Sequence, residues 1–175
     1  MPKPMISTTP TRVGAKFEEP RSEFKEIVVQ IKRCTKVVKG GKRFKMAALV
    51  VVGDGQGQVG IGYEKAKEVP FAVRKAVKNA QKHLFKVSLK DTTIPHRISA
   101  KHGSTTVLLR PACRGTGLIA GAAVRAVVEL AGIKDILTKI IGNTNPINVT
   151  QATAKALQQL KSKQEIEKLR GIQII

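Results

Sequence analysis

The sequence predicts an α+β protein made of two small domains. β-Branched or alternating stretches precede stretches with helical periodicity, this order occurs twice, and glycine and proline separate the stretches. Hydrophobic residues make up 42% of the 175 residues, which is too many for a disordered basic tail and enough for a packed core. We expect a proline-rich tail at 1–21, one domain at 22–87, a second at 88–161 and a C-terminal tail at 162–175.

The first domain should contain three strands and one helix. Residues 26–38, 42–53 and 59–63 are β-branched, apolar or alternating, and glycine-rich turns separate them. Gly60 and Gly62 leave one face of the third strand bare, so another part of the chain must approach its backbone closely. Pro70 suits the first turn of a helix. The apolar stripe of that helix would be Val69, Val73, Ala76, Val77, Ala80 and Leu84.

The second domain should contain a small sheet and two helices. Two strands flank the turn at Gly103, and a glycine-rich segment then leads into a helix that ends before Gly132. A strand at 133–141 follows. Asn145 as N-cap and Pro146 at the first helical position then open a last helix, which runs to about residue 160.

The charge distribution predicts a nucleic-acid binder. Thirty-two basic and twelve acidic residues give a net charge of +20. Cations without any acid fill the segment 32–45, where they repel each other and stay poorly ordered unless an anionic partner, most simply a phosphate backbone, neutralises them. These cations are Lys32, Arg33, Lys36, Lys39, Lys42, Arg43 and Lys45. Further cations expected at the same interface are Lys65, Lys67, Arg74, Lys75 and Lys78.

The predicted helix carries cations, and no acid occurs between residues 71 and 89 to pair with them. This pattern favours a face that binds an anion. The alternative is a charged face that is simply solvated.

The aromatic content narrows the mode of nucleic-acid recognition. With no Trp, one Tyr and five Phe, the chain is poorly equipped to stack bases, so we expect it to recognise RNA through backbone and shape.

Two enzyme-like signals are better explained structurally. Gly55, Gly57 and Gly60 match a dinucleotide-binding pattern, but a strand rather than a helix follows, which favours a structural turn. Cys113 has no set of metal-ligand spacings around it, which favours a packed thiol beside surface histidines. We therefore expect no enzyme activity, cofactor, metal or small-molecule substrate, and no membrane span.

The segment around Gly115 and Gly117 has two interpretations, which the residues leave open. Free N–H groups at a helix start would bind an anion, with Arg110 and Arg114 nearby. Alternatively, the glycines allow tight packing against a neighbouring backbone.

Three long motifs carry a family resemblance. KVVKGGKRFKMAALVVVGDGQGQVGIGYEKAKEVPFAVRKAVKNA, LLRPACRGTGLIAGAAVRAVVELAG and GNTNPINVTQAT resemble bacterial-type small-subunit ribosomal protein five, and the match runs from about residue 29 to 160. The resemblance implies a first domain similar to double-stranded-RNA-binding domains, with a three-stranded antiparallel sheet and a helix. It also implies binding to 16S rRNA beside small-subunit ribosomal proteins four and eight, near the path of the messenger RNA, with roles in assembly and translational accuracy.

The resemblance also assigns roles to individual residues. Cys34, Thr35, Lys39 and Gly41 match a loop close to the spectinomycin site, and Gly117 and Arg125 match the contact with protein four. Glu64, Cys113 and Ala122 depart from the usual pattern, and the charge of Glu64 puts a close phosphate approach there in doubt. We expect a cytoplasmic ribosome of a bacterium, with a plastid-encoded copy as the other source. The alternative function is a free-standing duplex-RNA binder or RNA chaperone.

Overall fold

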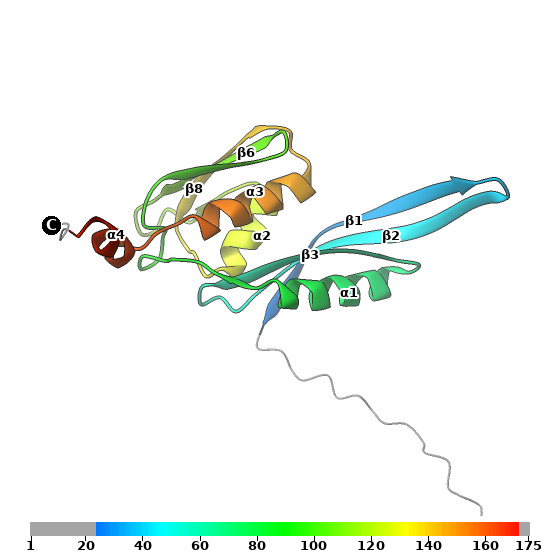
Figure 1. The fold of residues 1–175 in the computed structure, drawn as a ribbon, viewed down its shortest axis with the longest axis horizontal. Helices are drawn as coiled ribbons and strands as arrows, with labels where there is room; N and C mark the ends of the chain where they lie inside the picture. Colours follow the sequence, from blue (N-terminus) through cyan, green and yellow to red (C-terminus); the bar gives the residue numbers. More distant parts are fainter. Residues whose placement is uncertain (1–23, 172–175) are drawn as a thin grey trace, which may run out of the picture.

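A computed structural model describes residues 24–171, so the predicted tail at 1–21 lies outside the described residues. The first domain contains β1 (Lys25–Val38), β2 (Gly41–Gly53), β3 (Gln58–Ala66), α1 (Val69–Lys82) and β4 (Phe85–Lys86). The strands form one antiparallel sheet in the order β1-β2-β3-β4 (Figure 1). The α+β prediction is confirmed, and the sheet gains a fourth strand that is too short to leave a periodic pattern in the sequence.

Helix α1 packs on one face of this sheet. Ala48, Val50 and Val52 of β2 form a core with three alanines of the helix, Ala72, Ala76 and Ala80. The centre of the predicted stripe is confirmed, because Ala76 and Ala80 are buried and Val73 and Val77 pack half-buried against this core. The buried Ala72 was missed.

Gly60 and Gly62 explain why alanines form the buried row. A Cβ atom added at Gly60 would collide with the Ala80 carbonyl, and one added at Gly62 would collide with the Ala76 carbonyl. The predicted close approach to the bare face of β3 is therefore confirmed. The approaching segment is the helix backbone, and small side chains on both surfaces let it come that close.

The second domain contains β5 (Ile98–His102), β6 (Thr105–Pro111), β7 (Leu118–Ile119), α2 (Ala122–Leu130), β8 (Ile136–Gly142) and α3 (Pro146–Gln158). Its sheet has the order β5-β6-β8-β7, in which only the β7–β8 pair is parallel. Helix α3 begins after Asn145, as predicted, although the Asn145 side chain makes no capping hydrogen bond.

Helix α2 joins the two domains. Val124 and Val127 of α2 belong to the same buried cluster as Val51 and Val59 of the first sheet, and α2 contacts β1, β2 and β3. Figure 1 shows α2 between the two sheets. The two-domain layout is confirmed, but the domains share one continuous core on this side, so the first sheet is covered on both faces.

Residues 162–171 of the predicted C-terminal tail include the helix α4 (Lys163–Arg170). Its start is a capping box, in which Ser162 Oγ accepts from the Glu165 N–H and Glu165 Oε2 accepts from the Ser162 N–H. None of its residues is buried. Among the helices of residues 24–171, none has the length and hydropathy needed to cross a membrane.

Candidate nucleic-acid interface

Strands β1 and β2 continue beyond the sheet as a two-stranded ribbon. Ala66, the last residue of β3, lies opposite Met46, whereas β1 and β2 remain paired out to Val38 and Gly41. We call residues 33–46 the ribbon; it extends about 17 Å past the third strand, at ~3.3 Å per residue. The strands predicted on either side of Gly40 are confirmed, and the ladder pairs them as far as the turn at Lys39 and Gly40.

One side of the ribbon carries three cations, and two more lie on the same side at its base. Side chains directly opposite each other in a ladder point to the same side of the sheet, and successive residues alternate. Lys36 lies opposite Arg43, Cys34 opposite Lys45, and Ala47 pairs with both Lys32 and Lys65. We call this the cationic side; it consists of Lys32, Lys36, Arg43, Lys45 and Lys65.

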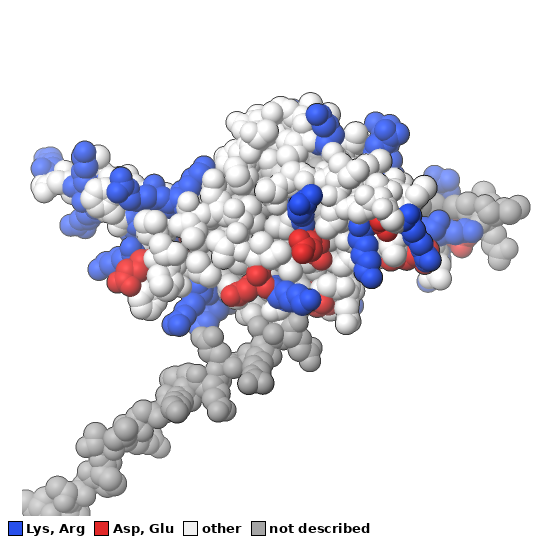
Figure 2. Space-filling view, turned by 180° about the vertical axis from the view of Figure 1, so that it is seen from behind, with Lys and Arg blue, Asp and Glu red and all other residues white. Residues whose placement is uncertain are grey.

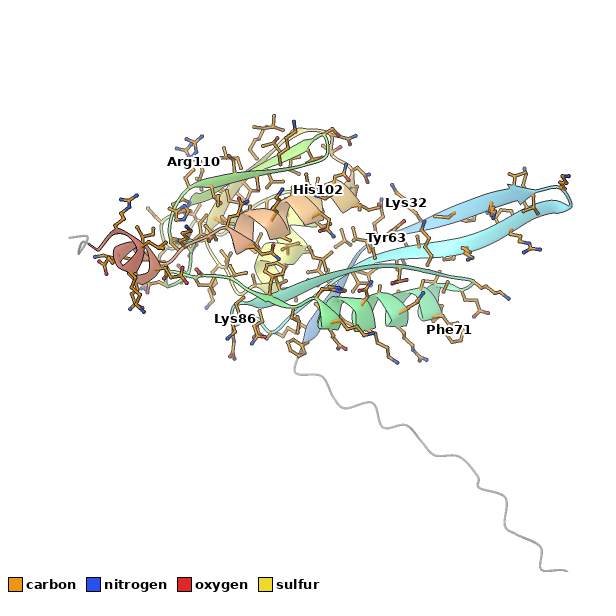
Figure 3. All side chains as sticks on the ribbon, viewed as in Figure 1. Lys32, Tyr63, Phe71, Lys86, His102 and Arg110 are labelled. Carbon is orange, nitrogen blue, oxygen red and sulfur yellow. The ribbon has the colours of Figure 1, made fainter. Side chains whose placement is uncertain are left out.

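The cationic side faces away from α1 and has no internal counter-charge. Figure 3 shows Lys32 on the side of the sheet opposite α1, and no acid occurs between residues 27 and 53. Figure 2 shows the same arm from behind, with basic atoms and no acidic ones along it. The facing pair Lys36 and Arg43 destabilises the free ribbon, because like charges directly opposite each other repel. An anionic partner would remove that repulsion.

The other side of the ribbon, which we call the α1 side, is less charged. Arg33 and Lys42 are its cations, and Val37 and Phe44 are exposed between them. Lys39 lies in the turn and Lys67 in the connection from β3 to α1, both exposed. The predicted RNA-binding residues therefore do not form one surface but two sides and a tip.

Helix α1 holds one of its cations in an internal ion pair. Lys75 Nζ lies 3.0 Å from Glu64 Oε2 of β3, and Asn79 Nδ2 donates to Glu64 Oε1 at 2.9 Å. The hydrogen bond from Lys75 is the main cause that lowers the pKa of Glu64. The expectation that Lys75 has no acidic partner was wrong, since the acid comes from a neighbouring strand. Arg74 and Lys78 remain exposed on the same helix.

The position of Glu64 bears on whether its charge would keep a phosphate away from Lys65. Glu64 lies opposite Ala48, on the α1 side, whereas its neighbour Lys65 lies opposite Ala47, on the cationic side. The carboxylate is therefore directed to α1 and away from the surface where Lys65 lies.

The four positions matched to the drug-proximal loop are spread over the ribbon. Cys34 is half-buried on the cationic side, Thr35 is exposed on the α1 side, Lys39 lies in the turn, and Gly41 directly follows it. Gly41 has φ +138°, a conformation that side chains disfavour. A direct contact with a small molecule would therefore involve the tip rather than all four residues.

The loop at residues 113–117, which we call the glycine loop, differs from both predictions made for it. The N–H groups of Gly115 and Gly117 donate to Asp135 Oδ1 at 3.0 and 2.9 Å, and Asp135 is only 5% exposed. Hydrogen bonds to its carboxylate lower the pKa of Asp135. The bond from the Gly117 N–H contributes most, followed by one from the Thr92 side chain, and the Gly115 N–H also contributes. Both predictions were wrong: the protein's own carboxylate takes these N–H groups, and nothing packs where a Cβ would stand.

The two residues predicted for a protein interface, Gly117 and Arg125, lie close to each other beside the glycine loop. β7 and Gly121 separate Gly117 from α2, which begins at Ala122, later than predicted. Arg125 of α2 reaches back, and its Nη2 donates to the Leu118 carbonyl at 3.1 Å. Gly117 and Arg125 thus lie at one exposed corner of the second domain.

The enzyme-like motifs have structural explanations. Asp54 Oδ1 accepts from the N–H groups of Gln56 and Gln58, and the Gly55 N–H donates to the Leu130 carbonyl at the end of α2. The glycine pattern is therefore a turn that docks on the second domain. Cys113 is exposed, so the packed-thiol prediction was wrong, and no group of metal-ligating side chains occurs within residues 24–171.

Comparison with known proteins agrees with both domains. "Ribosomal protein S5, N-terminal domain" matches residues 24–88, and "Ribosomal protein S5, C-terminal domain" matches residues 100–170. A protein of Rubrobacter xylanophilus named "Small ribosomal subunit protein uS5" is 52% identical over 153 residues, covering 87% of this chain and 76% of the relative.

The chain belongs to the ribosomal protein S5 family. The resemblance found in the sequence is thereby confirmed. Members of this family are ribosomal proteins, so the chain is a structural ribosomal protein by descent. The cationic side of the ribbon lies within the matched N-terminal domain, and the corner with Gly117 and Arg125 lies within the matched C-terminal domain.

Proposed function

We propose that this protein is a constituent of the small subunit of the cytoplasmic ribosome, where it binds 16S rRNA and contributes to subunit assembly and translational accuracy. The observation that carries the proposal is the cationic side, which has three cations on the projecting ribbon and two at its base, and no acid on that side of the sheet among residues 27–53. The name of the Rubrobacter relative, a small-subunit protein, supports assignment to the small rather than the large ribosomal subunit.

The ribbon binds RNA through its phosphates. Each Lys or Arg that neutralises a phosphate releases a condensed counterion, so binding gains free energy that falls as salt rises. Lys32 and Lys65 flank Ala47 on neighbouring strands and stand about 10 Å apart, at ~4.8 Å per strand. A spacing held by hydrogen-bonded strands recognises the shape of the backbone rather than its sequence.

The shared core gives this surface a fixed position. Helix α2 packs against the first sheet, and the turn at Gly55 is hydrogen-bonded to the end of α2. The second domain is thereby held at one orientation to the ribbon. We infer that the protein acts as a clamp that fixes RNA segments bound at the ribbon relative to partners bound by the second domain.

The partners proposed beside 16S rRNA are small-subunit proteins four and eight, with the messenger RNA path nearby. The corner with Gly117 and Arg125 is the proposed contact with protein four. The ribbon tip, with Lys39 and Gly41, is the proposed neighbour of the spectinomycin site. The resemblance supplies these assignments, and the exposure of Lys39 and Arg125 supports them.

Sedimentation tests the proposal. Native extract is separated on sucrose gradients at low and high salt, and the protein is followed by antibody. We expect it in the small-subunit peak at low salt and its release as salt rises, because phosphate contacts weaken steeply with salt. Recovery mainly in the free fraction at low salt, together with tight binding to generic duplex RNA, would favour the free-standing RNA binder instead.

A further inference from the structure

Phe44 and Arg33 form a stacked pair on the α1 side of the ribbon. Arg33 lies opposite Met46 and Phe44 opposite Thr35, so the two are diagonal neighbours on one side of the ladder. The Arg33 Cζ atom lies 5.2 Å from the centre of the Phe44 ring. The guanidinium therefore holds one face of the ring at cation–π distance.

The Phe44 ring is nevertheless left open to a partner. Its side chain is 51% exposed, and its neighbour Val37 is 71% exposed. The ring lies beyond the end of β3, so no third strand covers it. The ring is therefore accessible to a partner, and the cation beside it distinguishes it from an apolar residue that is merely exposed.

No other ring in residues 24–171 has this arrangement. Tyr63 has Lys65 at 5.6 Å, but it is half-buried within the sheet. Phe71 is 58% exposed at the start of α1, and no cation lies over it (Figure 3). Phe24 and Phe85 are half-buried against the two cores.

The charge around Phe44 indicates what kind of partner it meets. Arg33 and Lys42 lie on the same side of the ribbon, and the cationic side lies behind it, with no acid between residues 27 and 53. A nucleotide has a flat base that can stack on the Phe44 ring and a phosphate that can pair with the cations. An apolar protein surface would satisfy the ring but leave the cations without counter-charge.

We propose that Phe44, backed by Arg33, is a stacking platform for an unpaired base of the RNA that the ribbon binds, with Lys42 contacting an adjacent phosphate. The inference rests on the proposed function. It departs from the expectation that scarce aromatics make stacking unlikely, because one exposed ring can hold one base. The ribbon then uses its two sides differently: the cationic side reads charge and the α1 side holds a base.

Salt dependence separates stacking from phosphate contact. Binding of the full chain to 16S rRNA is titrated at several salt concentrations for Phe44→Leu, Phe44→Tyr and Lys42→Ala. We expect Phe44→Leu to weaken binding by about 5- to 150-fold without changing the slope of log K against log salt. Lys42→Ala should reduce the magnitude of that slope by about 0.7 to 0.9, and Phe44→Tyr should bind like the wild type.

A fluorescence measurement shows the contact directly. The chain has no Trp, so Phe44→Trp gives a single reporter at the platform, and Ile119→Trp gives one on an exposed position of the second domain. We expect 16S rRNA to quench the emission of Phe44→Trp and to leave that of Ile119→Trp nearly unchanged. Circular dichroism melts establish that the variants are folded.

The outcomes distinguish this inference from the proposed function. If the wild type fails to bind 16S rRNA, the proposed function fails. If the wild type binds but Phe44→Leu binds equally well, or Phe44→Trp binds without quenching, the platform is overturned while RNA binding stands. Normal binding of Phe44→Leu to bare rRNA with loss from assembled subunits would identify a protein contact and also overturn the platform.

Discussion

The ribbon and the glycine loop look alike in the sequence and differ in the structure. Both combine glycine with nearby cations, and each is a plausible anion site. In the ribbon, the cationic side has Lys36, Arg43 and Lys45, and no acid occurs between residues 27 and 53 to pair with them. In the glycine loop, Asp135 already accepts the N–H groups of Gly115 and Gly117.

The difference shows which donors remain available to a partner. A buried carboxylate with several N–H donors is a completed site, since its charge is compensated within the fold. A row of exposed cations without acids is an incomplete site, because repulsion within it falls only when an outside anion binds. The ribbon is therefore the surface that we propose as the RNA contact, and the glycine loop supports the corner with Gly117 and Arg125.

Removing the charge of the cationic side should have the largest effect on RNA binding. The change replaces all five of its residues by glutamine, that is Lys32, Lys36, Arg43, Lys45 and Lys65. We expect the slope of log K against log salt for 16S rRNA to fall in magnitude by about 3.5 to 4.5, at ~0.7 to 0.9 per phosphate contact. Filter binding at several salt concentrations measures it.

A matched control tests whether position or net charge matters. It replaces five exposed cations of the second domain and its C-terminal helix by glutamine, which gives the same net charge: Lys101, Arg110, Lys139, Lys155 and Lys163. We expect a clearly smaller change in slope. Equal changes in the two variants would mean that overall charge, and not the ribbon, drives binding.

A second test concerns Asp135, whose carboxylate already pairs with the N–H groups of the glycine loop. Asp135→Ala removes the acceptor and leaves the N–H groups of Gly115 and Gly117 without a partner, so we expect a lower Tm at neutral pH. Asp135→Asn should lose less, because its amide oxygen still accepts. Added sulfate should stabilise Asp135→Ala more than the wild type, since the freed N–H groups can then bind an anion.

The same carboxylate predicts a pH dependence. Because its folded pKa is lowered, Asp135 contributes stability that is fully present above its unfolded pKa of about 3.9 and is lost as the pH falls through the folded value. The Tm difference between the wild type and Asp135→Asn should therefore shrink in acid. Asp54→Asn is the control, since Asp54 also accepts two N–H groups, in an exposed turn. A difference that is constant from pH 7 to pH 2 would contradict the role given to Asp135.

The sequence predicted features that depend on near neighbours. Alternation and glycine breaks located both strands of the ribbon, Pro70 and Asn145 marked two helix starts, and the bare face at Gly60 and Gly62 predicted a close approach. In each case the deciding residues lie within one element or one turn, where local sterics and periodicity act.

The failures concern partners that are distant in sequence. Asp135 lies 20 positions from Gly115 in the sequence. Glu64 lies on strand β3, whereas its partner Lys75 lies on helix α1. A donor is visible in a local pattern, but its acceptor is brought in by the fold. Ladder register likewise decides that Phe44 and Arg33 share a side, so a count of aromatics did not show their contact. The capping box at Ser162 and Glu165 was a local signal that we missed.

Glu64 sharpens the comparison within the first domain. Glu64→Gln removes the counter-charge of Lys75 and makes that lysine available to RNA. If Lys75 then reaches a phosphate, the salt slope should grow in magnitude by about 0.7 to 0.9 and binding at low salt should tighten. Glu68→Gln is the control, since it makes the same charge change at an exposed position next to α1. An unchanged slope for Glu64→Gln would place α1 outside the RNA interface.

The smallest effects are expected where the two regions meet their proposed partners on the ribosome. Replacing Lys39 or Gly41 at the ribbon tip should alter the response to spectinomycin with little change in stability, because the tip lies outside both cores. Replacing Arg125 should instead change stop-codon readthrough. Its guanidinium bonds the Leu118 carbonyl beside the glycine loop, so Arg125→Ala removes a charge and loosens the corner that we assign to protein four.

The size of the Arg125 effect follows from its exposure. Loss of an exposed charge at a protein contact is worth about 1 kcal/mol or less, so ribosomes should assemble and accuracy should shift rather than fail. Arg125→Lys is the informative companion, because it keeps the charge but cannot reproduce the planar guanidinium geometry. Growth inhibition by spectinomycin and readthrough are measured on both variant classes. If tip variants changed only readthrough and Arg125 variants only drug response, the two assignments would have to be exchanged; if neither changed, ribbon and corner would be parts of the rRNA scaffold alone.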